Sequence, residues 1–173
     1  DVYKRQGLEL QVAYLPPLID GLRLTAAYGY NDSNYVKFVG PCAGGQKPSE
    51  GCNVPDGGLT LQNLNGSKKA LAPENRLNLG INYNSILRSG LELGFNMNLK
   101  ASDDYRLSDT IPDIKQPRYN TVDAGISLSS PTAGWKLALI GRNLGDEYIQ
   151  TSGSDAPSTG GGAGTEAGFA GDR

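Results

Sequence analysis

The sequence predicts an all-β protein, an antiparallel up-and-down meander of about six strands, on three observations. Six segments of roughly ten residues alternate strictly between apolar and polar side chains, the pattern of strands with two different faces. The links between these segments alternate between short and long. Glycine contributes 24 of 173 residues, roughly double its usual share, which disfavours a helical fold.

The expected strands lie near residues 7–15, 21–31, 75–84, 90–101, 119–129 and 134–144. Each carries apolar side chains at every second position, so that they share one face of the strand. In strand order, representative residues of this face are Leu8 and Leu10, Leu22 and Leu24, Leu79 and Ile81, Leu93 and Phe95, Val122 and Ile126, and Leu137 and Leu139.

Every charged side chain in the alternating part of these segments falls on the opposite face, together with Gly, Ala, Asn, Thr and Ser. One face therefore meets hydrocarbon or a protein core, and the other meets water. The charged residues are Glu9, Arg23, Arg76, Glu92, Lys100, Asp123, Lys136 and Arg142.

The lengths of the links favour a membrane barrel. Short links lie near residues 16–20, 84–90 and 129–134, and long ones near 32–75, 101–120 and after 143. In an up-and-down meander all short turns then lie at one end, which is typical of outer-membrane β-barrels with long external loops. Strands of about ten residues, tilted by roughly 40°, cover an apolar band of about 25 Å. Tyrosines and Trp135 near the strand ends suit an interfacial girdle.

This interpretation assigns a side to individual residues. Six strands are too few to close a membrane barrel, since the smallest has about eight, so we expect the chain to be part of a larger wall. The expected lipid-facing residues are Leu24, Leu79, Ile81, Leu93, Phe95, Ile126, Leu137 and Leu139. The expected lumen-facing residues are Arg23, Arg76, Glu92, Lys100, Asp123 and Arg142, either free to meet a ligand or plug, or paired with carboxylates on neighbouring strands.

Composition excludes several function classes. The 16 Lys and Arg residues against 18 Asp and Glu residues give a net charge of -2, without the basic excess that nucleic-acid binding needs. With no histidine, neither a serine–histidine nor a cysteine–histidine catalytic pair can form. Two cysteines without histidine cannot complete a structural zinc site. We therefore expect no enzymatic activity and no cofactor.

Two stretches resemble the late barrel strands of TonB-dependent outer-membrane receptors. The first is Gly-Leu-Glu-Leu-Gln-Val-Ala-Tyr at residues 7–14, with the proline turn and Tyr28-Gly29-Tyr30-Asn31-Asp32 that follow. The second runs from Tyr119 through the Trp135 strand to a motif formed by Asn143, Leu144, Asp146 and Tyr148. The resemblance implies a 22-stranded barrel, closed around an N-terminal plug that would precede this segment, and a closing strand that would follow it.

Several local predictions accompany this picture. Cys42 and Cys52 are expected to form a disulfide in an external loop, because envelope proteins fold in an oxidising compartment; two free thiols are the alternative. Residues 1–6 fit the alternation poorly and are expected to be strand edge, loop or an artefact of the sequence end. Residues 152–173 read as a glycine-rich loop or truncated tail, without a further alternating strand. The acidic residues Asp103, Asp104 and Asp109 are expected to be solvated rather than to hold a cation.

The resemblance implies an active transporter of the bacterial outer membrane. Its partners would be membrane lipid, the TonB complex acting through the plug, and a bulky ligand such as a siderophore, cobalamin or oligosaccharide, with no nucleic acid. Two other functions share the strand pattern. A passive porin or autotransporter barrel would lack the plug, and a soluble β-sandwich would cover its apolar face with a second sheet.

Overall fold

The computed structural model describes residues 2–111, 114–155 and 166–170. Its main element is a single antiparallel sheet of six strands in the order β1-β2-β6-β7-β10-β11. Sequential long strands are neighbours throughout, so the sheet is the predicted meander. The strands are β1 (Val2–Tyr14), β2 (Leu22–Lys37), β6 (Asn75–Ile86), β7 (Glu92–Ser102), β10 (Tyr119–Ser130) and β11 (Trp135–Gly141).

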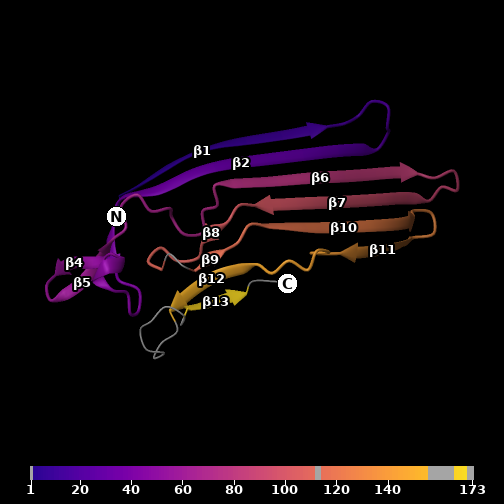
Figure 1. Ribbon diagram of the computed structural model, residues 1–173. Coiled ribbons are helices and arrows are strands. Elements are labelled where there is room, and N and C mark those ends of the chain that lie inside the picture. Colours follow the sequence, from indigo (N-terminus) through magenta and orange to yellow (C-terminus); the bar gives the residue numbers. More distant parts are fainter. Residues whose placement is uncertain (1, 112–113, 156–165, 171–173) are drawn as a thin grey trace.

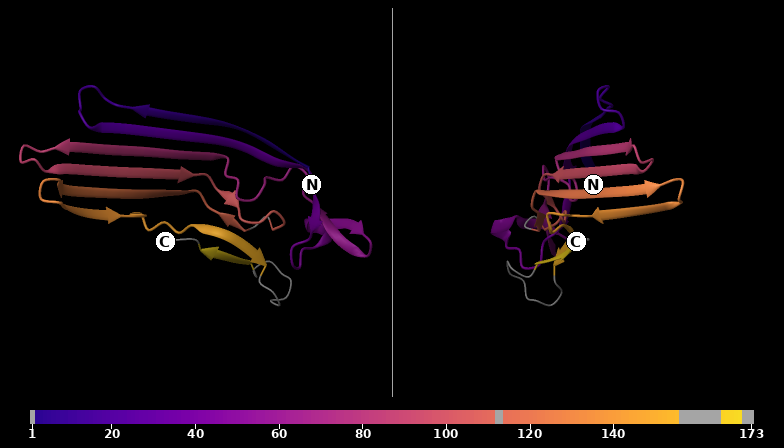
Figure 2. Two further views of the ribbon diagram at one scale, coloured as in Figure 1. Left: turned by 180° about the vertical axis from the view of Figure 1, so that it is seen from behind. Right: turned by 90° about the vertical axis from the view of Figure 1, so that its right-hand side faces the viewer.

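The short and long connections lie at opposite ends of this sheet (Figure 1). The turns after β1, β6 and β10 are at one end, and glycines with positive φ occur in each of them: Gly21, Gly90 and Gly134. At Gly21 a side chain is also excluded sterically, because an added Cβ would lie 1.7 Å from the carbonyl oxygen of Asn84. Figure 2 shows the sheet from two further sides as one layer of strands.

The long connections contain structure that the sequence pattern does not predict. The first holds a three-stranded sheet of β3 (Val39–Pro41), β5 (Leu59–Asn63) and β4 (Cys52–Asp56), with a 3-10 turn at Pro48–Glu50. The second holds the short pair β8 (Tyr105–Arg106) and β9 (Lys115–Gln116). These elements form a body beyond one end of the main sheet.

At the start of the chain the structure shows one of the expected alternatives, a continuation of the first strand, whereas the end of the chain differs from the expectation. β1 begins at Val2, and residues 3–6 continue its ladder against Ser33, Asn34 and their neighbours in β2. The segment predicted to be a loop or tail contains a hairpin of β12 (Gln150–Asp155) and β13 (Glu166–Ala170), so a short strand does follow β11. Residues 156–165 and 171–173 of that predicted tail lie outside the described part of the chain.

Buried apolar side chains gather in the loop body rather than on the sheet. Among the described residues the small core cluster consists of Leu107, Ile111 and Ile114, with Ala43 and Tyr105 packed against it. Cys52 in β4 and Leu64 directly after β5 are also buried, as is Tyr35 in the last part of β2. No helix in the described ranges is long and apolar enough to span a membrane.

Candidate functional site

The apolar face of the sheet is continuous across the strands. Strand register places apolar residues directly opposite one another in rows. One row runs Tyr14, Leu24, Ile81, Met97 and Ala124; its neighbours run Val12, Ala26, Leu79, Leu99 and Val122, and Leu22, Tyr83, Phe95, Ile126 and Leu139. Together these rows form a continuous apolar band that runs across the strands.

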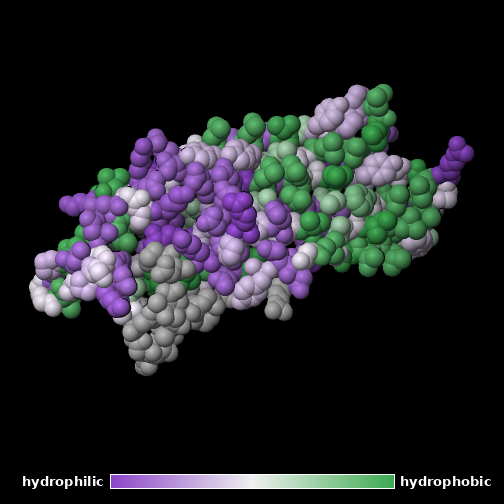
Figure 3. Space-filling model, in the orientation of Figure 1, coloured by the Kyte–Doolittle hydropathy of each residue, from purple (hydrophilic) through white to green (hydrophobic). Residues whose placement is uncertain are grey.

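This band is not covered by the chain itself. Ile126, Leu137 and Leu139 are 50%, 70% and 74% exposed, and Leu79, Ile81 and Phe95 also remain exposed. Figure 3 shows apolar residues gathered over the half of the molecule near the short turns, and polar residues over the loop end. The second layer that a soluble β-sandwich requires does not exist among the described residues.

The opposite face carries the charged residues that the sequence assigned to a lumen. Arg23 lies opposite Asn82, Arg76 opposite Gly29 and Ser102, and Lys100 opposite Asn78 and Thr121. The sequence left open that these cations pair with carboxylates on neighbouring strands. Within the described residues, no such salt bridge is formed by Arg23, Arg76, Lys100 or Arg142. The salt bridge that is present joins Lys68 and Glu74.

The lumen-assigned carboxylates make other contacts. Glu92 accepts a hydrogen bond from Ser129 Oγ at 3.3 Å, and Asp123 accepts one from the backbone N–H of Asn143 at 2.8 Å. Asp123 therefore ties β10 to the chain that leaves β11. Arg142 lies just beyond the last paired residue of β11.

The Asn143 motif forms a compact turn directly after β11. The Asn143 side chain donates to the carbonyl of Glu147 at 2.9 Å and accepts from the N–H of Glu147 at 3.0 Å. Asn143 and Asp146 both have positive φ, a conformation that asparagine and aspartate tolerate better than most residues. Leu144 lies over Gly141, where an added Cβ would meet its side chain at 2.5 Å. The motif thus has a structural role in ending the strand.

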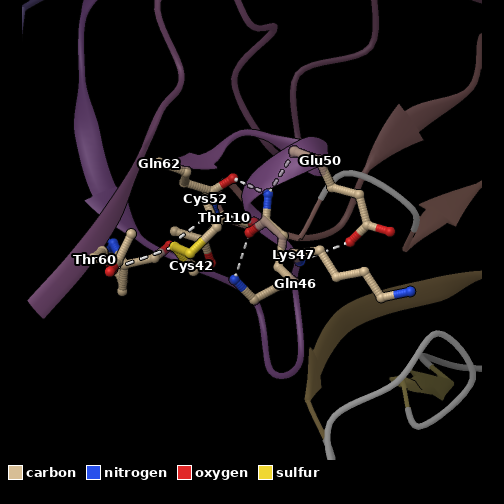
Figure 4. The surroundings of a disulfide bond; sticks show 10 residues. Cys42, Gln46, Lys47, Glu50, Cys52, Thr60, Gln62 and Thr110 are labelled. Carbon is tan, nitrogen blue, oxygen red and sulfur yellow. Dashed lines mark hydrogen bonds between the residues drawn. A yellow bond between two sulfur atoms is a disulfide. The ribbon is translucent and has the colours of Figure 1, made fainter. Parts of the chain in front are cut away.

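The two cysteines are paired in the structure, with a sequence separation of ten residues (Figure 4). The disulfide joins the end of β3 to the start of β4 and closes the turn that holds Pro48–Glu50. Inside this turn, Gln46 accepts a hydrogen bond from the N–H of Ala43 at 2.9 Å and donates to the carbonyl of Glu50 at 2.9 Å.

Gln62 connects this disulfide loop to the next one. Its side chain is 3% exposed and donates to the carbonyl oxygens of Pro41 and Thr110, both at 2.7 Å. Thr110 belongs to the connection between β7 and β10, so the first two long loops are joined (Figure 4). Asp109 adds a second link by accepting the N–H of Ala70 at 2.7 Å.

Gln116 connects the second loop to the third. It is 1% exposed, accepts the N–H of Gln150 at 2.6 Å, and donates to the carbonyl of Tyr148 at 3.4 Å. No sequence pattern points to Gln62 or Gln116, because each is one polar residue in a polar loop. Only the fold reveals that they are buried and bridge different loops.

Two of the three acidic loop residues, Asp103 and Asp109, accept hydrogen bonds. Asp103 accepts from the Asn75 side chain at 2.6 Å, and Asp109 holds Ala70 as described above. The described residues contain no group of three or more potential ligands arranged to hold a metal ion. In the same loop region the hydrogen bond to Glu74 raises the pKa of Lys68, while burial raises the pKa of the Tyr105 phenol.

Comparison with known proteins gives one match. A family model described as TonB dependent receptor-like, beta-barrel matches residues 1–144, which include all six long strands. No curated protein and no solved structure matches the chain.

Proposed function

Since the chain belongs to the family of TonB-dependent receptor barrels, we propose that it forms part of the wall and outer loops of an active transporter in the bacterial outer membrane. The uncovered apolar face is the observation that carries this proposal. A face with leucines up to 74% exposed is stable only if another apolar phase covers it, and acyl chains do so along the whole band.

In this proposal the residues predicted to face lipid and lumen keep those roles. Leu24, Leu79, Ile81, Leu93, Phe95, Ile126, Leu137 and Leu139 contact lipid, and Arg23, Arg76, Glu92, Lys100, Asp123 and Arg142 face the lumen. The rows of cross-strand pairs support the first set, since its members lie on one continuous band. The short turns then face the periplasm, and the linked loops face the outside.

The segment supplies architecture rather than bond-making chemistry. The parent receptor would bind a bulky ligand, such as a siderophore, cobalamin or oligosaccharide, at the outer loops. Release inward would need energy that the TonB complex transmits through a plug domain. The polar, mixed-charge inner face and the interlocked outer loops of this segment suit the side of such a path.

Energy dependence tests the proposal against a passive porin or an autotransporter barrel, which would share these strands. Cells producing the full-length receptor should accumulate its ligand, and uptake should stop when TonB is deleted or the proton gradient is collapsed. Ligand binding to the same cells should persist in both cases. Uptake that continues without TonB would contradict an active transporter and favour a pore.

A further inference from the structure

A recess of about 170 Å³ opens on the lumen-assigned face of the sheet, below the outer loops. We propose that it binds one neutral, hydroxyl-bearing group of the transported ligand, such as a single sugar ring. The inference rests on the proposed function, because it takes the polar face to line the ligand path. The lining residues used below are Arg5 and Glu9 of β1, Gly29 of β2, Arg76 of β6, and Leu71 and Pro73 of the preceding loop.

The floor of the recess is Gly29, and its environment differs from that of the other strand glycines. A Cβ added at Gly80, Gly94 or Gly125 would meet the side chain of a neighbouring strand at 3.0 Å or less. A Cβ added at Gly29 would meet no heavy atom within 4 Å. Among the glycines of the six long strands, Gly29 alone leaves open space above the sheet. A glycine inside a strand often marks a place where a ligand approaches the backbone closely.

The rim of the recess is a bulge of the chain between Lys69 and Glu74. On either side of it the loop pairs with β2, through Lys69 N–H to the Ser33 carbonyl at 3.0 Å and Asn31 N–H to the Glu74 carbonyl at 2.8 Å. Leu71, within the bulge, has φ of 57°, which is unfavourable for a bulky side chain. Its N–H donates to the Arg106 carbonyl at 2.8 Å, so the second loop holds the bulge in place. Strained backbone held by its surroundings is characteristic of binding sites.

Charge on the two sides of the floor indicates the ligand chemistry. Glu9 and Arg76 both lie directly opposite Gly29 in the ladder, one on each side. They are therefore about 10 Å apart at the backbone, two strand spacings. Glu9 only accepts hydrogen bonds and Arg76 only donates them. A hydroxyl group can do both, so a ring with several hydroxyls satisfies both walls.

Other ligand classes fit less well. A carboxylate or phosphate entering the recess would be attracted by Arg76 and Arg5 but repelled by Glu9, and an ammonium group would be attracted by Glu9 but repelled by both arginines, so an ion of either sign meets a wall of its own charge. Leu71 and Pro73 offer apolar surface to the C–H face of a sugar. A volume of about 170 Å³ is below the roughly 300 Å³ at which pockets for drug-sized ligands begin, so the recess takes one ring rather than a whole ligand.

Saturation-transfer NMR on the full-length receptor tests the proposal, in a detergent without a sugar headgroup. Glucose and maltose are the neutral probes, and citrate is the anionic probe. We expect saturation transfer to the ring protons of the sugars and none to citrate. Gly29→Leu fills the recess and should abolish the signal, and Arg76→Met should weaken binding about tenfold or more. The control Ala27→Leu places the same leucine side chain on the same face of β2, two residues away.

Four results would overturn the inference. The first two are that neither sugar gives a signal and that Gly29→Leu leaves the sugar signal unchanged. The third is that citrate alone binds, which would make the recess an anion subsite. The fourth is that Gly29→Leu renders the plug sensitive to protease while Ala27→Leu does not, which would assign the recess to plug packing. Each of these leaves TonB-dependent uptake by the wild-type receptor untouched, so failure here is distinct from failure of the transporter proposal.

Discussion

A charge placed on the apolar face should destabilise the folded receptor according to its depth in the membrane, and Met97 is the position to test. The apolar side of β7 reads Leu93, Phe95, Met97, Leu99 and Ala101, so Met97 is its central residue. Its neighbours in register are Ile81 and Ala124, both uncharged. Met97→Arg therefore introduces an unpaired charge near the middle of the proposed bilayer contact.

The expected magnitude follows from that position. An arginine at the bilayer midplane of a barrel costs about 2–4 kcal/mol, and the cost falls to about 0–1 kcal/mol near the interfaces. Phe95 lies two residues from Met97 on β7, about 5 Å away along the membrane normal for a strand tilted by roughly 40°, and Leu79 on β6 lies in the row on the other side of Met97. Phe95→Arg and Leu79→Arg should therefore cost slightly less than Met97→Arg but remain well above the interface value.

The matched control is Asn98→Arg, the next residue on β7 and on the opposite face. Asn98 lies opposite Asp123 and Gly80, so an arginine there gains a cross-strand carboxylate rather than a like charge. Asn78 is a weaker control, because Lys100 lies directly opposite it. We expect a change of less than about 0.5 kcal/mol for Asn98→Arg, as for most surface substitutions.

Reversible urea unfolding of the full-length receptor in lipid vesicles measures these differences, and heat-modifiable gel mobility reports whether the barrel has assembled. Equal stability of Met97→Arg and the wild type, together with loss of assembly in Asn98→Arg, would mean that the two faces are assigned the wrong way round. Equal costs at both positions would mean that neither face meets lipid.

Three further predictions concern the long loops. Replacing Cys42 and Cys52 by serine should remove about 3 kcal/mol of loop-closure stabilisation and open the loop to protease, while heat-modifiable mobility stays unchanged. Gln116→Leu should leave the N–H of the half-buried Gln150 unsatisfied, at a cost of about 1 kcal/mol, and amide hydrogen exchange of β9 and β12 should rise without a change in β6 or β7. Asn143→Ala should destabilise the turn after β11 by about 1–2 kcal/mol. Asn143→Gly should be less destabilising, because glycine tolerates positive φ. Equal thermal unfolding temperatures of the two variants would contradict this prediction.

The sequence predicts the sheet well because the period of two is a direct consequence of strand geometry. Once Leu22, Leu24 and Ala26 alternate with charged or small polar residues, a strand with one apolar face follows, and link lengths decide which strands are neighbours. The same reasoning does not predict that β2 continues to Lys37. Residues 31–34 are polar on both faces, since both faces of that extension meet water or other loops, and no alternation remains to detect.

The loop body was predictable only in part. The cysteine pair could be expected, because two cysteines in one external loop have a single possible partner each. The β3-β5-β4 sheet, the buried glutamines and the Leu71 bulge depend on contacts between loops that are distant in sequence. The recess at Gly29 has the same origin: its floor is a residue of β2, its walls belong to β1 and β6, and its rim is held by Arg106 of β8.

The distribution of buried residues indicates that the loop body and the main sheet are stabilised by different surroundings. Leu107, Ile111 and Ile114 are buried by other loop residues, so the outer body can exclude water from its own small core. The longer apolar rows of the sheet are covered by nothing in the described chain, although they hold far more apolar surface. Loop packing should therefore respond to reduction of the disulfide and to loss of Gln62 or Gln116, whereas the sheet should respond to charge on its apolar face. A substitution that weakened both parts equally would contradict this division.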